Sequence, residues 1–375
     1  MITIYSVLHF LVDAVCAYAM FGRFGNAGVY AYLLYNLCAF VLQLPIGAVI
    51  DLITMKLDEA AAKRFNRGIT SIGVIITLVG MYAGTYVLGI GNAIFHSGGG
   101  VRCIKEDRTK QLNGKGLGIF VAPGALGLFV GKLLTSYDSY RVYIQIALIV
   151  VAIIGLLCAY LRSNYETRRS QQDCEIRRPQ PDYETRYSQH TGSDIAVVGS
   201  VEDKFKASGC SVLFAVLCCF LVVILRSYVG LAMKFDWKSR LVMSFLAVAA
   251  VALGKAAGGF AAAKAGRVRT ICISLGLAGI AFYFSHMAVG GLLALFFFNM
   301  TMPITLHMMT EVLPDTPGIA FGTLSLGLFI GFLPVYFDVS LPVSGVWIGV
   351  AGSLISLGIL LLPILTAVKK QVGKK

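Results

Sequence analysis

The chain has 375 residues, of which 57% are hydrophobic and only 14% are charged, and its mean hydropathy is +0.77. A water-soluble fold with so few charged residues would lack polar surface, so the composition excludes a soluble globular protein and indicates a polytopic membrane protein. The net charge of +13 falls mostly in predicted loops and tails, so we interpret it as a signal of membrane orientation and expect no nucleic-acid partner.

Apolar runs of about 20 residues are long enough to cross a bilayer as helices, and they predict twelve spans. In chain order these are residues 2–20, 27–50, 68–82, 84–104, 114–134, 141–161, 210–232, 241–263, 270–287, 289–309, 317–337 and 343–367. We therefore expect an all-α polytopic membrane protein, with one six-helix bundle over 1–162, a second over 209–375, and a linker over 163–208.

The first span lacks a basic segment before it and a small-residue cleavage site after it, so we expect it to remain as a helix. The linker is rich in Arg, Gln, Ser and Asp and is too polar to bury a core. It repeats a short motif, Tyr165-Glu166-Thr167-Arg168-Arg169-Ser170-Gln171 and Tyr183-Glu184-Thr185-Arg186-Tyr187-Ser188-Gln189, which is typical of a flexible tether. Most lysines and arginines lie in loops on the side of the linker and both termini. This distribution predicts that these segments are cytoplasmic and that the protein spans the inner (plasma) membrane many times.

The two halves share a glycine pattern. Gly118-Ile119 followed by Leu126-Gly127-Leu128-Phe129-x-Gly131-x-Leu133 recurs as Gly318-Ile319 followed by Leu326-Gly327-Leu328-Phe329-x-Gly331-x-Leu333. An internal repeat on this scale is typical of duplicated membrane transporters.

The sequence offers little for catalysis or cofactor binding. The nine cysteines fall mostly within spans, and neither the cysteines nor the five histidines have the spacing of zinc ligands. No nucleophile, base and orienting group occur together, and no phosphate-binding loop is present. We expect no enzymatic activity, no cofactor and no metal.

Polar residues inside the spans are costly in hydrocarbon and usually face the interior of a bundle. They occur in groups spaced by four, which places each group on one helix face. The groups are His9 and Asp13, Asn92 and His96, and Asn299, Pro303, His307 and Glu311, together with the single cations Arg226 and Lys255.

Two loop motifs resemble the signature of the major facilitator superfamily. Gly47-x-x-x-Asp51 ends the second span, and the stretch from Gly259 to Arg267 ends the eighth span, with Ala263 in place of the usual acid. In the fifth span, Ala122-Pro123-Gly124 and the following glycines resemble the glycine-proline signature of the drug/proton antiporters in that superfamily. The resemblance implies gating roles for Gly47, Asp51, Pro123, Gly259 and Arg267.

The same resemblance implies that the first, fourth, seventh and tenth helices line a central cavity. It would place His9, Asp13, Asn92, His96, Arg226, Asn299 and His307 around one pocket. From the chemistry of the side chains within the spans we expect substrate binding by Asn92, His96, Arg226, Lys255, Asn299 and His307, and proton coupling by His9, Asp13, His96 and Glu311. Such a cavity is mostly positive and favours an anionic or zwitterionic ligand, which Arg226 can bind through two hydrogen bonds. A counter-ion role for Lys255, to Asp13 or Glu311, is as well supported as a ligand role.

These observations predict a monomeric secondary transporter whose partners are a small-molecule substrate, protons and membrane lipid. Arg226-Ser227, Gly254-Lys255 and Phe95-His96 are similar to the fosmidomycin-resistance type, which implies proton-coupled efflux. Uptake with protons and lipid flipping remain alternatives, the second with slight support from Phe296-Phe297-Phe298. A membrane sensor is disfavoured because no sizeable soluble domain is present.

Overall fold

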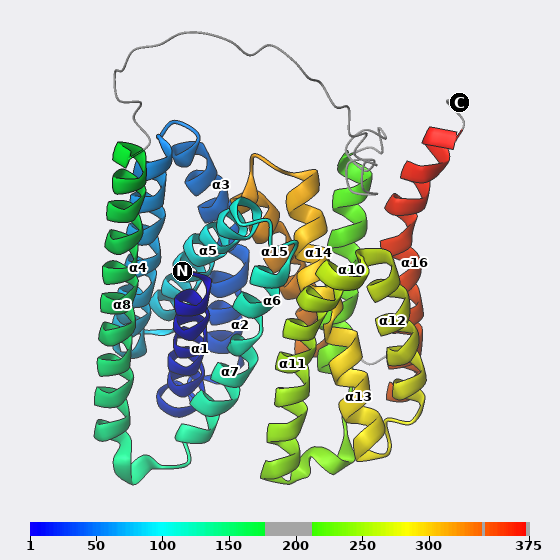
Figure 1. The fold of residues 1–375 in the computed structure, drawn as a ribbon. Helices are drawn as coiled ribbons and strands as arrows, with labels where there is room; N and C mark the ends of the chain where they lie inside the picture. The colour runs from blue at the N-terminus through cyan, green and yellow to red at the C-terminus, as the bar shows by residue number, and fades with distance from the viewer. Residues whose placement is uncertain (177–211, 340–341, 373–375) are drawn as a thin grey trace.

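The protein is a bundle of membrane-spanning helices in two halves. A computed structural model describes residues 1–176, 212–339 and 342–372, and this part of the chain contains helices and no strand. Figure 1 shows α4 and α8 at one edge of the molecule, α12 and α16 at the other edge, and α6 and α7 beside α11 in the middle. The predicted all-α fold of twelve spans in two six-helix bundles is confirmed.

The first bundle consists of α1 (Ile2–Tyr18) with η1 (Ala19–Arg23), α2 (Gly28–Asn36) with η2 (Leu37–Val41) and α3 (Gln43–Thr54), α4 (Glu59–Ala83), α5 (Thr85–Thr109), α6 (Lys115–Val121) with α7 (Pro123–Leu134), and α8 (Arg141–Ile176). The second consists of α10 (Val212–Ala232), α11 (Leu241–Ala265), α12 (Arg267–Tyr283), α13 (Ala288–Asn299) with α14 (Thr301–Val312), α15 (Pro317–Tyr336) and α16 (Gly345–Val372).

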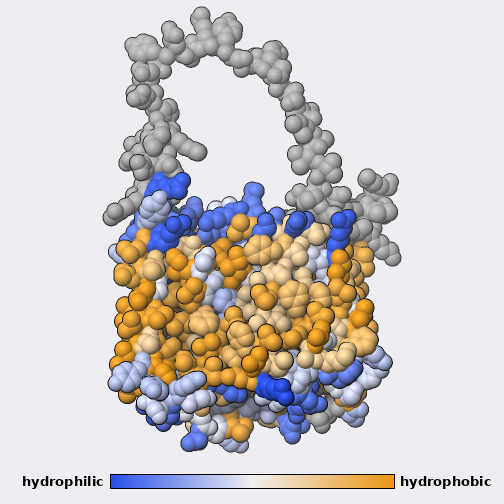
Figure 2. Space-filling model, turned by 60° about the horizontal axis from the view of Figure 1, so that its bottom comes forward, coloured by the Kyte–Doolittle hydropathy of each residue, from blue (hydrophilic) through white to orange (hydrophobic). Residues whose placement is uncertain are grey.

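On the face shown in Figure 2, a broad band of apolar side chains lies between two polar rims. Ten helical segments of the described chain are long and apolar enough to cross a membrane. The remaining two of the twelve helices are α5, which carries several charged residues in its last turns, and α12, which has 17 residues. Both nevertheless pack within their bundles, α5 against α4 and α12 against α13 and α16.

Proline explains why three of the spans are broken. A proline has no N–H and cannot bond to the carbonyl four residues earlier, so the helix is interrupted or bulged one turn before it. Pro45 follows the π-helical segment η2, Pro123 begins α7, and Pro303 lies in the first turn of α14. Each break borders the space between the two bundles.

Two helices extend further than the hydropathy pattern predicts. α4 begins at Glu59, nine residues before the expected start of its span, because the Asp58 carboxylate caps its N-terminus by accepting from Ala61 N at 2.8 Å. α8 continues to Ile176, so the first part of the segment expected as linker is helical. The rest of that segment, residues 177–208, lies outside the described residues, as does the second copy of its short motif.

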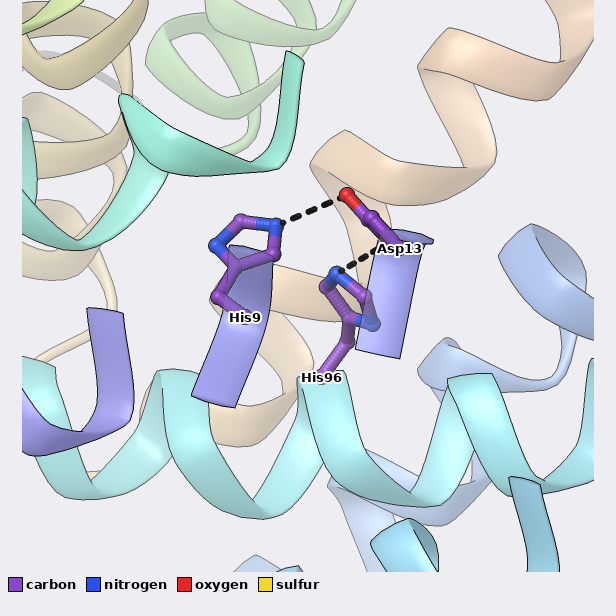
Figure 3. A group of neighbouring side chains, drawn as sticks. All are labelled: His9, Asp13 and His96. Atoms are coloured by element: carbon purple, nitrogen blue, oxygen red, sulfur yellow. Dashed lines mark ion pairs between the residues drawn. The ribbon is translucent and has the colours of Figure 1, made fainter. Parts of the chain in front are cut away.

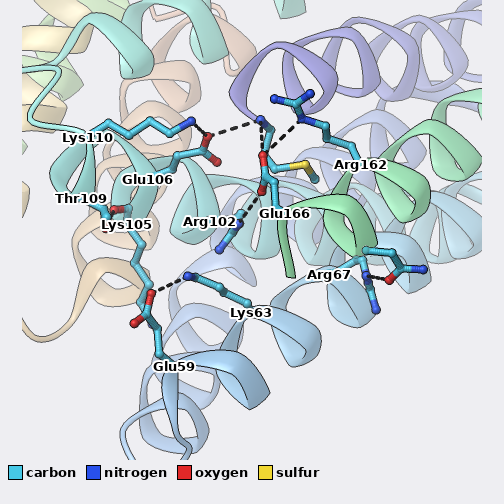
Figure 4. A network of polar contacts seen from close by, with 12 residues as sticks. Glu59, Lys63, Arg67, Arg102, Lys105, Glu106, Thr109, Lys110, Arg162 and Glu166 are labelled. Atoms are coloured by element: carbon cyan, nitrogen blue, oxygen red, sulfur yellow. Dashed lines mark hydrogen bonds and ion pairs between the residues drawn. The ribbon is translucent and has the colours of Figure 1, made fainter. Parts of the chain in front are cut away.

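Ion pairs connect α8 to the rest of the first bundle at the face where α8 ends and α10 begins, which we call the linker face (Figure 4). Glu166 lies 3.7 Å from Arg102 and 3.3 Å from Arg162. The Met1 amino group lies 3.3 Å from Glu106 Oε1 and 3.8 Å from Glu166. The ends of α1, α5 and α8 are thereby held together.

Candidate functional site: a central cavity between the bundles

A cavity of about 470 Å³ lies between the two bundles. It receives side chains from α1, α2, α3, α5 and α7 on one side and from α10, α11, α13, α14 and α15 on the other. The polar residues predicted to bind substrate or protons that do line it are His9, Asp13, Asn92, His96, Arg226, Lys255 and Asn299. Much of its remaining wall is aromatic or aliphatic, including Tyr32, Phe40, Leu295, Phe321, Phe329 and Phe332.

His9, Asp13 and His96 form one cluster in the wall of the first bundle (Figure 3). Asp13 Oδ2 lies 3.3 Å from His9 Nε2, and Asp13 Oδ1 lies 3.7 Å from His96 Nε2. Asn92 Nδ2 also donates to Asp13 Oδ1, at 3.4 Å. All four side chains are buried, so one carboxylate is shared by two imidazoles and an amide.

Main-chain carbonyls fix which nitrogen of each imidazole carries a proton. His9 Nδ1 lies 2.7 Å from the Phe120 carbonyl oxygen, and His96 Nδ1 lies 2.9 Å from that of Asn92. A carbonyl oxygen only accepts, so both Nδ1 atoms must donate. In the neutral rings both Nε2 atoms are then unprotonated, and both face the carboxylate. Each of these two contacts becomes favourable only when a proton enters it, so the cluster can accept a proton at either position.

The break at Pro123 provides both the acceptor and the space for this cluster. It interrupts the helix next to Phe120, whose carbonyl accepts the proton of His9 Nδ1. A Cβ atom on Gly124 would lie 2.5 Å from Asp13 Oδ2 and would also overlap His9 Nε2. Pro123, predicted as a gating residue, and Gly124 therefore also border the cluster of His9, Asp13 and His96.

Arg226 projects from α10 into the opposite wall. It is 7% exposed, and its Nη1 atom has no hydrogen-bond partner in the part of the chain that the structure describes. A buried guanidinium without a carboxylate partner is costly, because its lost hydration is not replaced. Its neighbour Ser227 is satisfied by donating to the Leu328 carbonyl at 2.6 Å, so the unmet bonding capacity belongs to the arginine.

Lys255 on α11 lies between the two walls. It interacts electrostatically with Asp13 and with Arg226, yet within the described ranges it forms no hydrogen bond or ion pair. Asn299 donates from Nδ2 to the Leu295 carbonyl at 2.9 Å, which leaves its oxygen available to the cavity. The cavity is thus lined by one acid, Asp13, and two basic side chains, Arg226 and Lys255.

The structure does not place His307 and Glu311 with the other predicted site residues. They do not line the cavity but lie near the linker face, where Glu311 forms ion pairs with Arg267 of α12 and, at 3.4 Å, with His307. The spacing of four along α14 is correct. However, the residues of α14 that line the cavity are Met302 and Leu306, and neither His307 nor Glu311 is among them.

Two of the predicted gating residues, Gly47 and Asp51, contact the other bundle near the linker face, whereas Arg267 pairs with Glu311 within its own bundle. Asp51 Oδ1 accepts from Gly318 N and Oδ2 from Ile319 N, both at 2.9 Å, so the acid of one bundle caps helix α15 of the other. A Cβ on Gly47 would overlap the Gly318 carbonyl, and a Cβ on Gly318 would overlap that of Gly47.

The repeat produces a second glycine pair, in which Gly259 packs against Gly118 and Gly114. Ala263 occupies the position of the acid on that side, so only one of the two related contacts has a carboxylate cap.

Sequence reasoning missed other contacts between the bundles. Arg108 at the end of α5 donates to the carbonyls of Pro314 and Thr310, at 2.6 and 2.8 Å. Ser325 of α15 donates to Gln43 Oε1. A hydrogen bond at the opposite face joins Tyr336 to the Val29 carbonyl. Arg108 in a charged helix end and Gln43 just before Pro45 were visible in the sequence, but their partners were not.

The ligand atoms of His9, Asp13 and His96 lie within 4.8 Å of one another, which is close enough for a shared cation. The positive charge of Lys255, which acts on Asp13, opposes any added cation there, and a divalent metal more strongly than a single proton.

Comparison with known proteins identifies the fold. No protein-family model matches the sequence, and no curated protein matches it. Among solved structures, the human organic anion transporter MFSD10 (TETRAN) is 16% identical with a TM-score of 0.59 over 98% of each chain. The E. coli fucose:proton symporter FucP is 11% identical with a TM-score of 0.54 over 98% of each chain.

A bacterial homologue of the iron transporter ferroportin, in an outward-facing state, is 13% identical with a TM-score of 0.52 over 99% of this chain and all of that one. FucP is a major facilitator superfamily transporter, and the match covers both bundles. The chain therefore has the major facilitator fold.

Proposed function

We propose that the protein is a proton-coupled secondary transporter that moves a small anionic or zwitterionic organic solute across the inner membrane by alternating access. The observation that carries the proposal is Arg226, a buried cation that faces the cavity with an unsatisfied Nη1. A carboxylate, sulfonate or phosphonate would supply the missing acceptor through two parallel hydrogen bonds. Lys255 adds a second positive charge next to it, and the human organic anion transporter with this fold gives a precedent for such a substrate.

The apolar part of the wall suggests what else the substrate carries. Phe321, Phe329 and Phe332 of α15 line the cavity together with Tyr32 and Phe40, and the rings of Phe332 and Tyr32 pack edge to face with their centroids 5.9 Å apart. An anion with an aromatic or aliphatic body would bury that body there, as in other mostly apolar ligand sites with a few oriented polar groups. A lipid flippase has less support, because none of Phe296, Phe297 and Phe298 is among the residues that line the cavity.

The proposed transport cycle combines the orientation expected from the lysine and arginine distribution with the contacts between the bundles. With the linker and both termini in the cytoplasm, the linker face is the inner face, and the cap of Asp51 on α15 and the bonds of Arg108 hold it closed. Rocking of one bundle against the other would break these contacts and open the cavity inward. Efflux in exchange for protons is the direction that the resemblance to drug/proton antiporters favours, and uptake with protons is the alternative.

A thermal-shift screen of the purified protein tests the proposal, because a ligand that binds only the folded state raises the apparent melting temperature. We expect anions with an apolar body to stabilise the protein and cations of the same size not to. Arg226→Lys keeps the charge but loses the paired geometry and should weaken binding by roughly 1.5–3 kcal/mol.

Arg226→Ala should abolish the shift while the protein still folds. If Arg226→Ala binds the same anion with wild-type affinity, the proposal is wrong. If a cation panel stabilises the protein and the anion panel does not, the substrate class is wrong.

A further inference from the structure

We propose that the proton and the anion bind the cavity together, so that the protein is a proton–anion symporter and not an exchanger. This inference rests on the proposed function above and decides between its two directions of coupling. It is carried by the geometry of three groups: the cluster of His9, Asp13 and His96 in one wall, Arg226 in the other, and Lys255 between them.

The first step is the number of protons that the cluster can hold. Both Nδ1 atoms donate to main-chain carbonyls, so the two contacts of Asp13 with Nε2 are the places where protons enter. With neither contact protonated the cluster has one negative charge, and each added proton makes it more positive by one. Its charge therefore changes while the geometry of Asp13 and the two rings is retained.

The second step concerns the other groups around the cluster. The Sγ atom of Cys16 in α1 accepts a hydrogen bond from Asn92 Nδ2 at 3.4 Å, and Cys16 also interacts with Tyr35 of α2. The Cys16 thiol and the Tyr35 hydroxyl are both neutral at physiological pH. The α6–α7 break contributes only the Phe120 carbonyl and Gly124. The charged groups that face the cluster are therefore Lys255 directly and, through Lys255, Arg226.

The third step is the sign of the coupling. With no ligand, Lys255 acts on both Asp13 and Arg226 and can serve as the counter-ion of the carboxylate. An anion bound to Arg226 competes for Lys255 and leaves Asp13 without a cation, which favours entry of a proton at the cluster. A proton at the cluster removes the negative charge that would repel the anion. By linkage each ligand raises the affinity of the other to the same extent.

The consequence is a choice of coupling mode. Exchange requires that binding of one ligand expels the other, as expected for a cationic drug that competes with protons for an acid. Here the ligand has the opposite charge, so the fully loaded and the fully empty cavity are favoured over the singly loaded forms. In this scheme the positive charge of Lys255 balances the Asp13 carboxylate when neither the proton nor the anion is bound.

The experiment measures protons taken up when an anion binds to the purified wild-type protein in weakly buffered detergent solution. Naphthalene-2-sulfonate is a suitable probe, because a sulfonate remains ionised and takes no proton itself. We expect proton uptake that saturates together with anion binding, and an affinity that rises as the pH falls, by about tenfold per pH unit at most for one proton, within about pH 5 to 8.

Three variants locate the effect. Asp13→Asn should still bind the sulfonate but take up no proton, and its affinity should lose its pH dependence. Lys255→Gln should bind it more weakly and with less proton uptake per anion. Asp58→Asn is the matched control, because Asp58 is an exposed acid that caps α4 within its own bundle, and it should behave as the wild type.

Proton release on binding, or an affinity independent of pH in a wild-type protein whose binding requires Arg226, would overturn the symport inference and leave the proposed function intact. If neither naphthalene-2-sulfonate nor any other member of an anion panel binds in a way that depends on Arg226, the proposed function fails and this inference fails with it. The number of protons that the wild-type protein takes up or releases on anion binding decides between symport and exchange, even if a variant does not fold.

Discussion

At the scale of single residues, the site depends on small differences between side chains that look interchangeable in the sequence. Gly124 is one of many glycines in the fifth span, but it alone contacts both His9 and Asp13. Among the arginines that the structure describes, Arg226 is the one that combines a buried guanidinium with an Nη1 atom that has no hydrogen-bond partner. Function in this cavity is set by which polar groups are satisfied and which are not.

Gly124→Ala tests whether the cluster needs the space that glycine leaves. The added methyl group would overlap His9 Nε2 and Asp13 Oδ2, so we expect the His9–Asp13 contact to break and the protein to lose roughly 1–3 kcal/mol of stability. Proton uptake on anion binding should fall as well. Gly276→Ala is the control, because a Cβ at Gly276 of α12 meets nothing within 4 Å. Equal proton uptake by Gly124→Ala and wild type would contradict this assignment.

The sequence could predict much of the site and not all of it. Spacing by four placed His9 with Asp13 and Asn92 with His96 on shared helix faces, and charge inside a span identified Arg226 and Lys255. The same rule included His307 and Glu311, which lie beyond the cavity with Arg267, because spacing gives a face but not a depth along the helix. The carbonyl of Phe120 and the fit of Gly124 depend on packing between helices, which no local pattern encodes.

At the scale of elements, the two bundles meet through helix ends and glycine pairs. The repeat detected in the sequence has a structural meaning: Gly118 and Gly318 each pack against the signature glycine of the other half, Gly259 and Gly47. Only the contact of Asp51 with α15 includes a carboxylate cap, so the two sides of the interface are not equivalent. We expect the capped side to contribute more to closure of the linker face.

Asp51→Asn should weaken that closure, because an amide oxygen can accept only one of the two N–H groups and its NH₂ group repels the other. Spin labels at positions 57 and 315, in exposed loops of different bundles at the linker face, would report the change by pulsed electron paramagnetic resonance. We expect the distance distribution to be longer or broader in Asp51→Asn than in the wild type. Asp58→Asn removes a cap within one bundle and should give the wild-type distribution. Identical distributions in all three proteins would show that the cap does not hold the face closed.

Most helices could be predicted from hydropathy alone, and the reasons for the exceptions are physical. The start of α4 and the end of α8 carry charged residues that extend past the membrane, so a hydropathy pattern cannot detect them. The breaks at Pro45, Pro123 and Pro303 were visible as prolines, but whether each proline kinks, bulges or interrupts its helix depends on what fills the gap. At Pro123 His9 fills it, from a helix far away in the sequence.

At the scale of the whole molecule, orientation in the membrane connects the fold to the transport cycle. The excess of lysine and arginine at the linker face predicts that this face is cytoplasmic. Single cysteines at positions 180 and 372, in a background without the nine native cysteines, should resist a membrane-impermeant maleimide in intact cells and react after permeabilisation. Labelling of either position from outside would mean that the assigned orientation is inverted.

The central claim is that an organic anion crosses the membrane while bound to Arg226 and Lys255. The most direct test is the flux of the anion that gives the largest thermal shift, measured in liposomes that contain the purified protein. The account predicts flux with the wild type, none with folded Arg226→Ala, and exchange of labelled for unlabelled anion without accumulation by a pH gradient with Asp13→Asn. Flux through Arg226→Ala at the wild-type rate, or no flux through the wild type, would contradict the claim.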